Sequence, residues 1–442
     1  MRTLTYVIFF SCFSCLASLF SVAMAADMPM SLFEYQNSKS IIDSNIKYLV
    51  INQELKSAQV GQKLELKLPT GARISVTISD RQTKANQTTV VRAVGKDDVQ
   101  MLITIGEKAS FGSIDSPDIS YSLGFDPAGG QFLSNNLERA ASFIDLENDM
   151  MFPPSAKQGF KKTLPEPLLN SSAPADMTLM IVYSPEFGLG MGDPDTAIQQ
   201  LVEFTNQSLS NTGVDGQFRL VAAVELDFDN ELSNSTLLNQ VTEGSGAFSS
   251  VPSLRNQVGA DMVSVLSFSD TNSASGLAWV NGDNPDFAYS VRRLSPVCCS
   301  LVFAHELGHN LGSGHERDSV NPAAGSCDDG ASRGGFNGFS CGYGVAGNFG
   351  TIMSRIQSNA TSFNRFSNPN QICNGLPCGI AQGQANAADN FTSFNISAFL
   401  IEQFRPNVNP PTPEPNPRAP TSRNLTAIIA PLVPLLLNDD VY

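Results

Sequence analysis

The chain has 442 residues, a formal net charge of −15 and a pI of about 4.6. Nucleic acids and anionic membranes bind proteins through basic patches, so this acidity argues against either as the main partner. We interpret the excess of carboxylates as a solvated surface that keeps the protein soluble outside the cell.

The N-terminus has the features of a secretory signal peptide. Residues 1–2 are Met-Arg, residues 4–22 are almost wholly apolar, and residues 23–25, Ala-Met-Ala, form a small-residue cleavage site. A transmembrane anchor is the alternative, but the cleavage motif and the polar residues after it disfavour an anchor. We therefore predict cleavage after residue 25 and a secreted protein.

Residues 26–160 are predicted to form a β-rich domain. Apolar and polar residues alternate in 64–68, 74–78 and part of 99–105, which is the pattern of half-buried strands. Residues 161–173 then contain Lys-Lys and Pro-Glu-Pro and are predicted to be an exposed linker where the chain is processed. The region between the signal peptide and this linker contains no cysteine.

Residues 174–405 are predicted to be a mixed α/β domain, because strand patterns alternate with helical spacing. Strands are predicted at 179–183, 220–226 and 262–268. Helices are predicted at 196–209, at 301–311 and within 381–404. Residues 276–280 could be an edge strand that pairs with an extended peptide, or an ordinary edge strand.

All three histidines of the chain lie in one eleven-residue stretch, HELGHNLGSGH. His305 and His309, four residues apart, share one face of a helix and can direct both rings at one ion. Gly312 allows the turn out of the helix that brings His315 back to the same point. Three imidazoles leave one position of a tetrahedral Zn²⁺ open for water, which is typical of a catalytic site. Glu306 is placed to take a proton from that water.

Two other interpretations of this motif are open. A short His-Glu-x-x-His sequence can arise by chance, although here five fixed residue types agree. A zinc site can also persist in a protein that has lost catalysis. The presence of Glu306 argues against the second interpretation, because an inactive descendant has no need of a base.

Two of the eight cysteines lie in the signal peptide, and the other six predict three disulfides in an exported chain. The six are Cys298, Cys299, Cys327, Cys341, Cys373 and Cys378. The last two are expected to pair, because the loop between them is short and contains Asn, Gly and Pro. The adjacent pair at 298 and 299 is expected to bridge to different partners, such as those at 327 and 341. A four-cysteine zinc site is the alternative, but no Cys-x-x-Cys pair supports it.

The chain resembles the metzincin zinc endopeptidases, in which a Met-turn follows the zinc motif. The candidate Met-turn is residues 350–354, Gly-Thr-Ile-Met-Ser, and in metzincins the methionine, here Met353, forms an apolar floor under the imidazoles. Further similarity is to reprolysin-like bacterial secreted proteases, including peptidyl-Asp metalloendopeptidases, in residues 178–185, 260–263, 276–279 and 366–369.

Two positions depart from these families. Reprolysin-like sequences usually carry Asp after the third His, where this chain has Glu316. Astacins have Glu there, but they place a zinc-binding Tyr two residues after the Met, where this chain has Arg355. The resemblance to astacins is therefore weaker than that to reprolysin-like proteases.

The resemblance implies a catalytic domain with a twisted mixed sheet and a zinc-binding helix, preceded by a propeptide that inhibits it. Residues 111–114 resemble the propeptides of such proteases. Because this region has no cysteine, a thiol on zinc is excluded as the inhibitor, and a carboxylate or a steric plug would have to act instead. An accessory binding domain is the alternative for this region. Bound calcium occurs in the family, but no loop of this chain is specific enough to name a site.

The resemblance also suggests where specificity would arise. Arg355 and Arg365 lie near the wall that, in metzincins, shapes the pocket for the residue after the cut. A buried arginine there would favour an acidic side chain, although both could instead be surface residues. No fourth histidine exists to stabilise the oxyanion, so zinc would carry most of that charge unless a tyrosine such as Tyr343 assists.

Residues 406–442 are a Pro-rich linker followed by a thirteen-residue apolar run, 425–437, which is too short to span a bilayer. Membrane contact is not expected; surface retention or docking on the enzyme are alternatives for this tail. The sequence thus predicts a secreted zinc endopeptidase made with a propeptide and acting on extended peptides or proteins. The alternative is a zinc-containing extracellular binding or adhesion protein that cleaves nothing.

Overall fold

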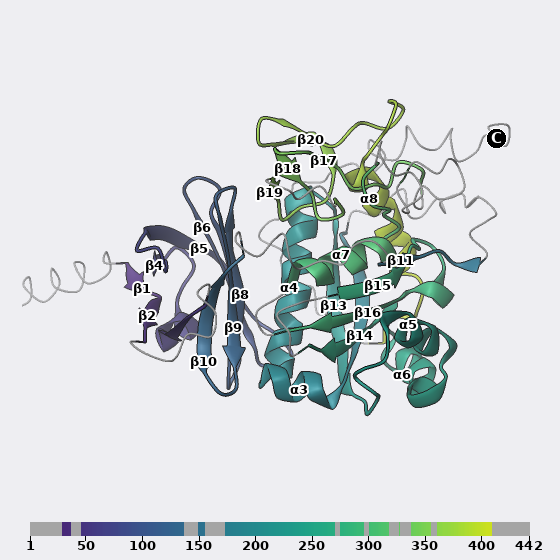
Figure 1. The fold of residues 1–442 in the computed structure, drawn as a ribbon, viewed down its shortest axis with the longest axis horizontal. Helices are drawn as coiled ribbons and strands as arrows, with labels where there is room; N and C mark the ends of the chain where they lie inside the picture. Colours follow the sequence, from purple (N-terminus) through teal and green to yellow (C-terminus); the bar gives the residue numbers. More distant parts are fainter. Residues whose placement is uncertain are drawn as a thin grey trace, which may run out of the picture.

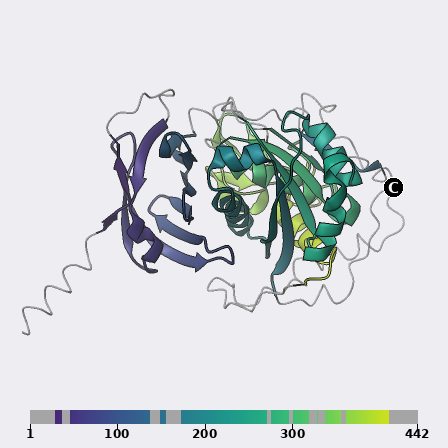
Figure 2. The ribbon, with the colours of Figure 1, turned by 90° about the horizontal axis from the view of Figure 1, so that it is seen from below.

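The computed structural model describes residues 29–36, 46–136, 149–154, 173–269, 275–295, 300–317, 327, 337–354 and 360–408. The predicted signal peptide, most of the linker and most of the tail lie outside the described residues, as do Cys298, Cys299 and Arg355. Two folded parts lie side by side, an N-terminal sheet domain (residues 29–136) and an α/β domain (residues 173–408) (Figure 1, Figure 2). No helix in these ranges is long and apolar enough to cross a membrane.

The N-terminal sheet domain is one mainly antiparallel sheet that closes on itself. Its strands are β1 (Met30–Ser31), β2 (Phe33–Tyr35), β3 (Ile46–Ile51), β4 (Lys63–Lys67), β5 (Arg73–Thr83), β6 (Thr89–Gly95), β7 (Gln100–Ile105), β8 (Ser110–Ser116), β9 (Ile119–Asp126) and β10 (Gly130–Asn135). Their order is β1-β4-β5-β6-β7-β8-β9-β10-β3-β2. β1 and β2 are consecutive in the chain but lie at opposite ends of this order, so the segment around buried Leu32 closes the sheet.

Apolar side chains fill the interior of the closed sheet. Leu64 and Leu66 of β4 and Val76 and Ile78 of β5 are buried there, and the residues between them point outward, as the two-residue period of a strand requires. The strands predicted at 64–68, 74–78 and 99–105 are confirmed as β4, β5 and β7.

The α/β domain is built on a six-stranded sheet in the order β11-β15-β16-β14-β12-β13. The strands are β11 (Met150–Met151), β12 (Ala175–Tyr183), β13 (Gly216–Glu225), β14 (Met262–Phe268), β15 (Ser275–Trp279) and β16 (Tyr289–Leu294). β12, β13, β14 and β16 are parallel, and β15 is antiparallel to β16. β11 precedes the processing linker in the chain, yet it pairs with β15 in parallel at the edge of this sheet (Figure 1).

Helices cover both faces of this sheet, because successive residues of β12 are apolar and point to alternate sides. Leu179 and Ile181 pack in one core with helices α3 (Pro185–Met191), α4 (Pro194–Thr212), α7 (Ser300–Asn310) and α8 (Asn390–Ile401). Met180 and Val182 pack in the other with α5 (Asn234–Glu243) and α6 (Val251–Val258). The predicted mixed α/β class is confirmed, as are the strands that became β12, β13 and β14 and the helices that became α4, α7 and α8.

Candidate metal centre

Helix α7 places the first two histidines and the glutamate in the core. His305, Glu306 and His309 are all at most 2% exposed. The helix then ends in a Schellman turn, in which Ser313 N donates to Gly308 O (2.9 Å) and Gly312 N donates to His309 O (2.8 Å). Gly312 has a φ of 95°, which a residue with a Cβ adopts only at a cost. This turn reverses the chain toward the helix.

The three imidazole rings converge on one point. Their centroids are 4.8–5.1 Å apart, and Nε2 of His305 lies 3.1 Å from Nε2 of His315. Nδ1 of His305 donates to Ile352 O and Nδ1 of His309 donates to Ser313 O, both at 2.8 Å. Because these Nδ1 atoms carry the protons, the Nε2 lone pairs face the common point, which is the tautomer that binds a metal.

A fourth group, Asp149, occupies the same point. Its Oδ2 lies 3.2 Å from Nε2 of His305, and its Oδ1 lies 3.0 Å from Nε2 of His315 and 3.8 Å from Nε2 of His309. The main chain beside Asp149 is held by the edge strand, since Ala278 N donates to Asp149 O (3.1 Å) and Val280 N donates to Met151 O (2.7 Å). The carboxylate is 1% exposed.

These four side chains fit a metal ion. Their donor atoms all lie within 4.8 Å of one another. His309 Nε2 and both carboxylate oxygens of Asp149 are buried without a hydrogen-bond partner among the described residues. Buried polar atoms without partners are costly, and two imidazole lone pairs 3.1 Å apart repel each other, so a shared cation would remove both penalties. Three nitrogens and one carboxylate are ligands that Zn²⁺ accepts in tetrahedral geometry.

Burial governs the charges of this cluster. It lowers the pKa of His309, and it lowers the pKa of His315 to about 4, so both rings are neutral at pH 7. Burial alone would raise the pKa of Asp149, but its contacts with the three imidazoles outweigh burial and hold that pKa well below its usual range. His309 and His315 are therefore neutral beside an anionic carboxylate, which is the state in which these groups bind a metal.

Glu306 lies beside the cluster with one oxygen, Oε2, buried and without a hydrogen-bond partner in the described ranges. Its carboxylate packs against the backbone of Gly276 in β15, where a Cβ would lie 2.1 Å from Oε1. Burial, and then the charge of Asp149, raise the pKa of Glu306, while Arg292 acts to lower it. A glycine in the edge strand thus makes room for the carboxylate.

Arg292 is a fully buried cation behind helix α7, and the sequence did not indicate it. Its guanidinium donates to Phe303 O (2.8 Å) and lies over the ring of Phe303, 4.2 Å from the centroid. Burial lowers the pKa of Arg292 to about 9, and Glu306 acts to raise it. The side chain joins β16 to the first turns of the metal-site helix.

Met353 lies directly against helix α7. It is fully buried, and a Cβ on Gly308 would lie 2.5 Å from its sulfur. The preceding residue, Ile352, supplies the carbonyl that orients His305. Residues 350–354 therefore both pack under the helix and fix one imidazole.

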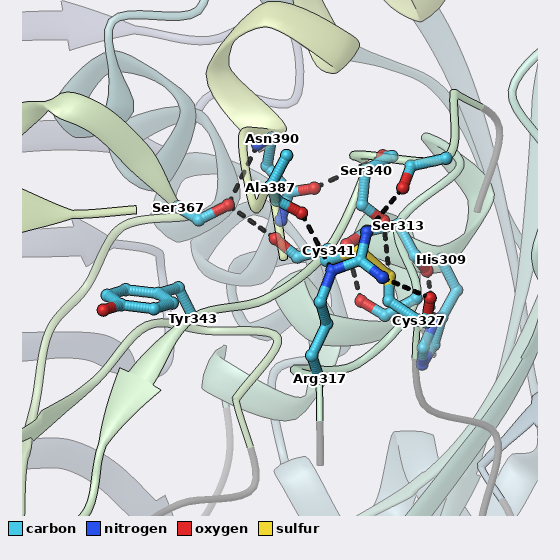
Figure 3. The surroundings of a disulfide bond; sticks show 12 residues. His309, Ser313, Arg317, Cys327, Ser340, Cys341, Tyr343, Ser367, Ala387 and Asn390 are labelled. Carbon is cyan, nitrogen blue, oxygen red and sulfur yellow. Dashed lines mark hydrogen bonds between the residues drawn. A yellow bond between two sulfur atoms is a disulfide. The ribbon is translucent and has the colours of Figure 1, made fainter. Parts of the chain in front are cut away.

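A disulfide between Cys327 and Cys341, with Cα atoms 6.0 Å apart, lies near Ser313 and Arg317 (Figure 3). Gly314 N donates to Ser340 O (2.8 Å), so the residue before His315 is held by the loop that this disulfide closes. Arg317 donates to three carbonyls of the same region, those of Cys327 (2.6 Å), Gly338 (2.6 Å) and Ala387 (3.1 Å).

The disulfides correct one sequence prediction and confirm another. Cys327 and Cys341 bond to each other, so the expectation that they bridge to Cys298 and Cys299 was wrong. The error arose because spacing along the chain does not report which Cα atoms meet in space. The predicted bond between Cys373 and Cys378 is confirmed, with Cα atoms 5.1 Å apart.

Two residues that the sequence suggested as part of the site make contacts away from the histidines. Arg365 donates to Gln371 Oε1 (3.2 Å), and its guanidinium lies 5.6 Å from the centroid of the Phe363 ring. The ring of Tyr343 packs on Phe349, with centroids 5.9 Å apart, and lies between the two disulfides. Neither side chain has a described contact with the imidazoles, and Arg355 lies outside the described residues.

Comparison with known proteins agrees with this geometry. Residues 173–367 match the family described as Metallo-peptidase family M12, of the reprolysin type. The α/β domain is a reprolysin-like metallopeptidase domain of family M12. Residues 29–136 match a BamI lipocalin-like domain, so the N-terminal sheet domain is a separate unit.

One curated relative and two solved structures are similar to the chain. The peptidyl-Asp metalloendopeptidase of Pseudomonas aeruginosa is 30% identical over 267 residues, which cover 55% of this chain and 43% of the relative. The chain thus spans less than half of the relative's length. A chaperone–substrate complex (TM-score 0.40, 15% identity, 79% of this chain and 43% of that chain) and metalloproteinase-II from Bacteroides fragilis (TM-score 0.37, 11% identity, 59% and 83%) are more distant.

The sequence did not single out Asp149. It excluded a thiol and left a carboxylate or a steric plug, but the N-terminal region contains many carboxylates in no distinctive motif. Only the pairing of β11 with β15 brings this one to the histidines. Gly276 belongs to residues 276–279, which resemble reprolysin-like proteases, but the sequence did not predict that this glycine makes room for Glu306.

Proposed function

We propose that the metallopeptidase domain is a zinc-dependent endopeptidase that acts on extended peptides or proteins. The observation that carries this proposal is the convergence of three imidazole rings on one point, two of them oriented by Nδ1–H donation to backbone carbonyls. Beside them lies the buried Glu306, whose Oε2 has no hydrogen-bond partner among the described residues. The family match of residues 173–367 supports it. The predicted signal peptide and the disulfides support an exported enzyme.

Each residue of the site would have a separate role. His305, His309 and His315 would hold zinc, which when bound lowers the pKa of a water molecule and polarises a peptide carbonyl. Glu306 would take the proton from the attacking water and return it to the leaving amine. Strand β15, which becomes the edge of the sheet when β11 leaves, would align the substrate. The N–H groups of Ala278 in β15 and of Val280 just after it already pair with the extended segment around β11.

Casein cleavage by the processed protein tests the proposal, with a chelator and with zinc restored afterwards. We expect activity to disappear with the chelator and to return with zinc. Glu306→Gln should keep zinc and lose activity by a factor of about a hundred or more, because it removes the base. Glu243→Gln, at an exposed helix position, is the matched control. Inactivity of folded, zinc-loaded, processed protein would favour the binding-protein alternative.

We also propose that residues 26–160 act as an inhibitory propeptide and that Asp149 is the inhibitory group. Its carboxylate lies at the point where the Nε2 lone pairs meet, and β11 takes the edge-strand donors that a substrate would need. A side-chain carboxylate, not a peptide carbonyl, faces the cluster, so the segment blocks the site without presenting a bond for cleavage. This arrangement supports the carboxylate alternative left open by the sequence.

A preference for acidic substrate side chains is a finer proposal. It is supported by the printed name of the Pseudomonas aeruginosa relative and by the presence of Arg355 and Arg365 after the Met-turn. Arg365 is half-buried, and burial lowers its pKa while Asp98 of the N-terminal sheet domain acts to raise it. Sequencing of cleavage products tests this idea, and a preference for bulky apolar side chains would remove it.

A further inference from the structure

Helix α4 of the metallopeptidase domain carries the N-terminal sheet domain on its outer face (Figure 1). Val90, Leu102 and Phe111 of that domain are buried in one continuous core with Leu201 and Phe204 of α4. Buried apolar area of this kind holds two domains together without a covalent link.

The backbone of the sheet domain also approaches side chains at the start of α4 closely. A Cβ on Gly106 would lie 1.8 Å from Oγ1 of Thr196. Lys108 N and Ala109 N donate to Asp193 Oδ2 at 3.2 and 3.1 Å, so the residue that caps α4 also holds a turn of the sheet domain.

A buried ion cluster lies at the centre of the same contact. Glu203 of α4 has a side chain that is 2% exposed, and it pairs with Arg92 and, at 2.8 Å, with Lys84. Both cations belong to the β5–β6 hairpin of the sheet domain. Within the metallopeptidase domain, the described partner of this carboxylate is the amide of Gln199, at 2.8 Å. The cations that neutralise Glu203 therefore come from across the domain boundary.

Further polar pairs extend the contact along the helix. Thr104 Oγ1 donates to Gln200 Oε1 at 2.8 Å. Gln100 Oε1 accepts from Gln207 at 2.6 Å and from Asn211 at 3.0 Å. Polar side chains of the sheet domain thus form hydrogen bonds with polar side chains along several turns of α4, as in specific protein–protein interfaces.

None of these contacts involves the predicted processing linker, 161–173. A cut between residues 154 and 173 breaks no described bond of the interface, and it leaves Asp149 covalently joined to the docked sheet domain. A tethered inhibitory group has a high effective concentration at its site. The cut by itself would therefore not uncover the histidines.

We propose that the N-terminal segment 29–154 stays bound to the metallopeptidase domain after the cut, docked on α4 through the Glu203 cluster, so that its release is the activating step. This proposal rests on the proposed endopeptidase function, because release of the segment is an activating step only if the domain is an enzyme. The docking itself is independent of catalysis and can be measured without it.

The test uses the full chain with Glu306→Gln, which prevents self-digestion, and a site for an added sequence-specific protease placed between residues 154 and 173. After the cut, we expect the two pieces to co-elute in size-exclusion chromatography at micromolar concentration. Glu203→Gln should speed their dissociation at least about tenfold, because it removes one partner of a buried charge pair. Arg92→Gln, which changes the same pair from the other side, should have an effect of similar size.

Two further variants separate docking from blocking. Glu231→Gln removes an exposed ion-pair partner (side chain 80% exposed) and should leave dissociation unchanged. Asp149→Ala should leave the pieces together, since the hold lies on α4. Separation of the parent pieces on the first column, or release caused by Asp149→Ala alone, would overturn the proposal. Because no activity is measured, absence of proteolysis would count only against the proposed function.

Discussion

The N-terminal segment touches the metallopeptidase domain in two places that differ in kind. On α4 the contact is broad, with apolar side chains, an ion cluster around Glu203 and several polar pairs. At the metal cluster it is one carboxylate and a two-residue strand, on the other side of the domain from the sheet domain (Figure 1). If the segment inhibits the domain as proposed, the difference means that different residues hold the segment and cover the histidines.

The largest effect should follow from removing the blocking carboxylate. We expect Asp149→Ala to raise peptide hydrolysis by the uncleaved chain about a hundredfold or more, because it removes the carboxylate that lies at the point where the imidazole nitrogens meet. A hundredfold change corresponds to about 2.7 kcal/mol. Asp118→Asn, at an exposed turn of the sheet domain, is the control. An uncleaved Asp149→Ala chain as inactive as the parent would show that something other than this carboxylate blocks the site.

A second substitution tests the metal centre apart from the segment that covers it. Gly276→Ala should lower hydrolysis by the processed protein about a hundredfold, because the new Cβ displaces Glu306 and a shift of about 1 Å is worth that much. Zinc content, measured on the same sample, should not change. Gly188→Ala in helix α3 is the control, because its new Cβ would come no closer than 3.3 Å to another atom, and that atom is Oε2 at the end of the flexible Glu225 side chain. Loss of zinc with Gly276→Ala would place the glycine in metal binding instead.

Removing the disulfides should affect the region around the metal cluster and not the contact on α4. Both disulfides among the described residues lie in the metallopeptidase domain and outside α4. Replacing Cys327 and Cys341 by serine should lower its stability by about 3 kcal/mol, and the shorter Cys373–Cys378 loop should cost about 2 kcal/mol. Thermal unfolding measures both. Docking of the cut segment on α4 should persist in both variants, and a loss of docking would mean that the two regions are coupled.

The smallest effect concerns the pH dependence of docking. Burial opposes the charge of Glu203, but Arg92 and Lys84 outweigh burial and lower its pKa in the docked state. In the separated pieces this pKa returns toward about 4.3, so docking is strongest above that value and weakens as pH falls through the lowered pKa. Affinity should fall by at most about tenfold per pH unit, as one proton allows. Calorimetric titration measures it, and Glu203→Gln should remove this component of the profile.

How much could be predicted from the sequence differs between the two regions. The metal-site helix was predictable because its information is local: a four-residue spacing on one helix and a glycine at its end suffice to bring His305, His309 and His315 together. Three strands in each domain were predictable for the same reason, since alternating or continuous apolar runs are short-range patterns. These strands are β4, β5, β7, β12, β13 and β14.

The residues that needed long-range contacts were not predictable. Arg292 carries no motif, and its place behind helix α7 depends on how β16 packs. The pairing of Cys327 with Cys341 depends on Cα positions that chain spacing does not report. Arg365, chosen for its position after the Met-turn, contacts Phe363 and Gln371 instead of the cluster.

The sequence by itself determined which chemical groups the candidate metal site contains: the three histidines, the neighbouring Glu306, and no thiol from the N-terminal segment. Those features follow from residue types and from spacings shorter than one helix. Only the tertiary structure decided which carboxylate meets the histidines and which helix holds the N-terminal sheet domain. Both depend on pairings between residues far apart in the chain, where strand register and side-chain packing select one partner among many of the same type.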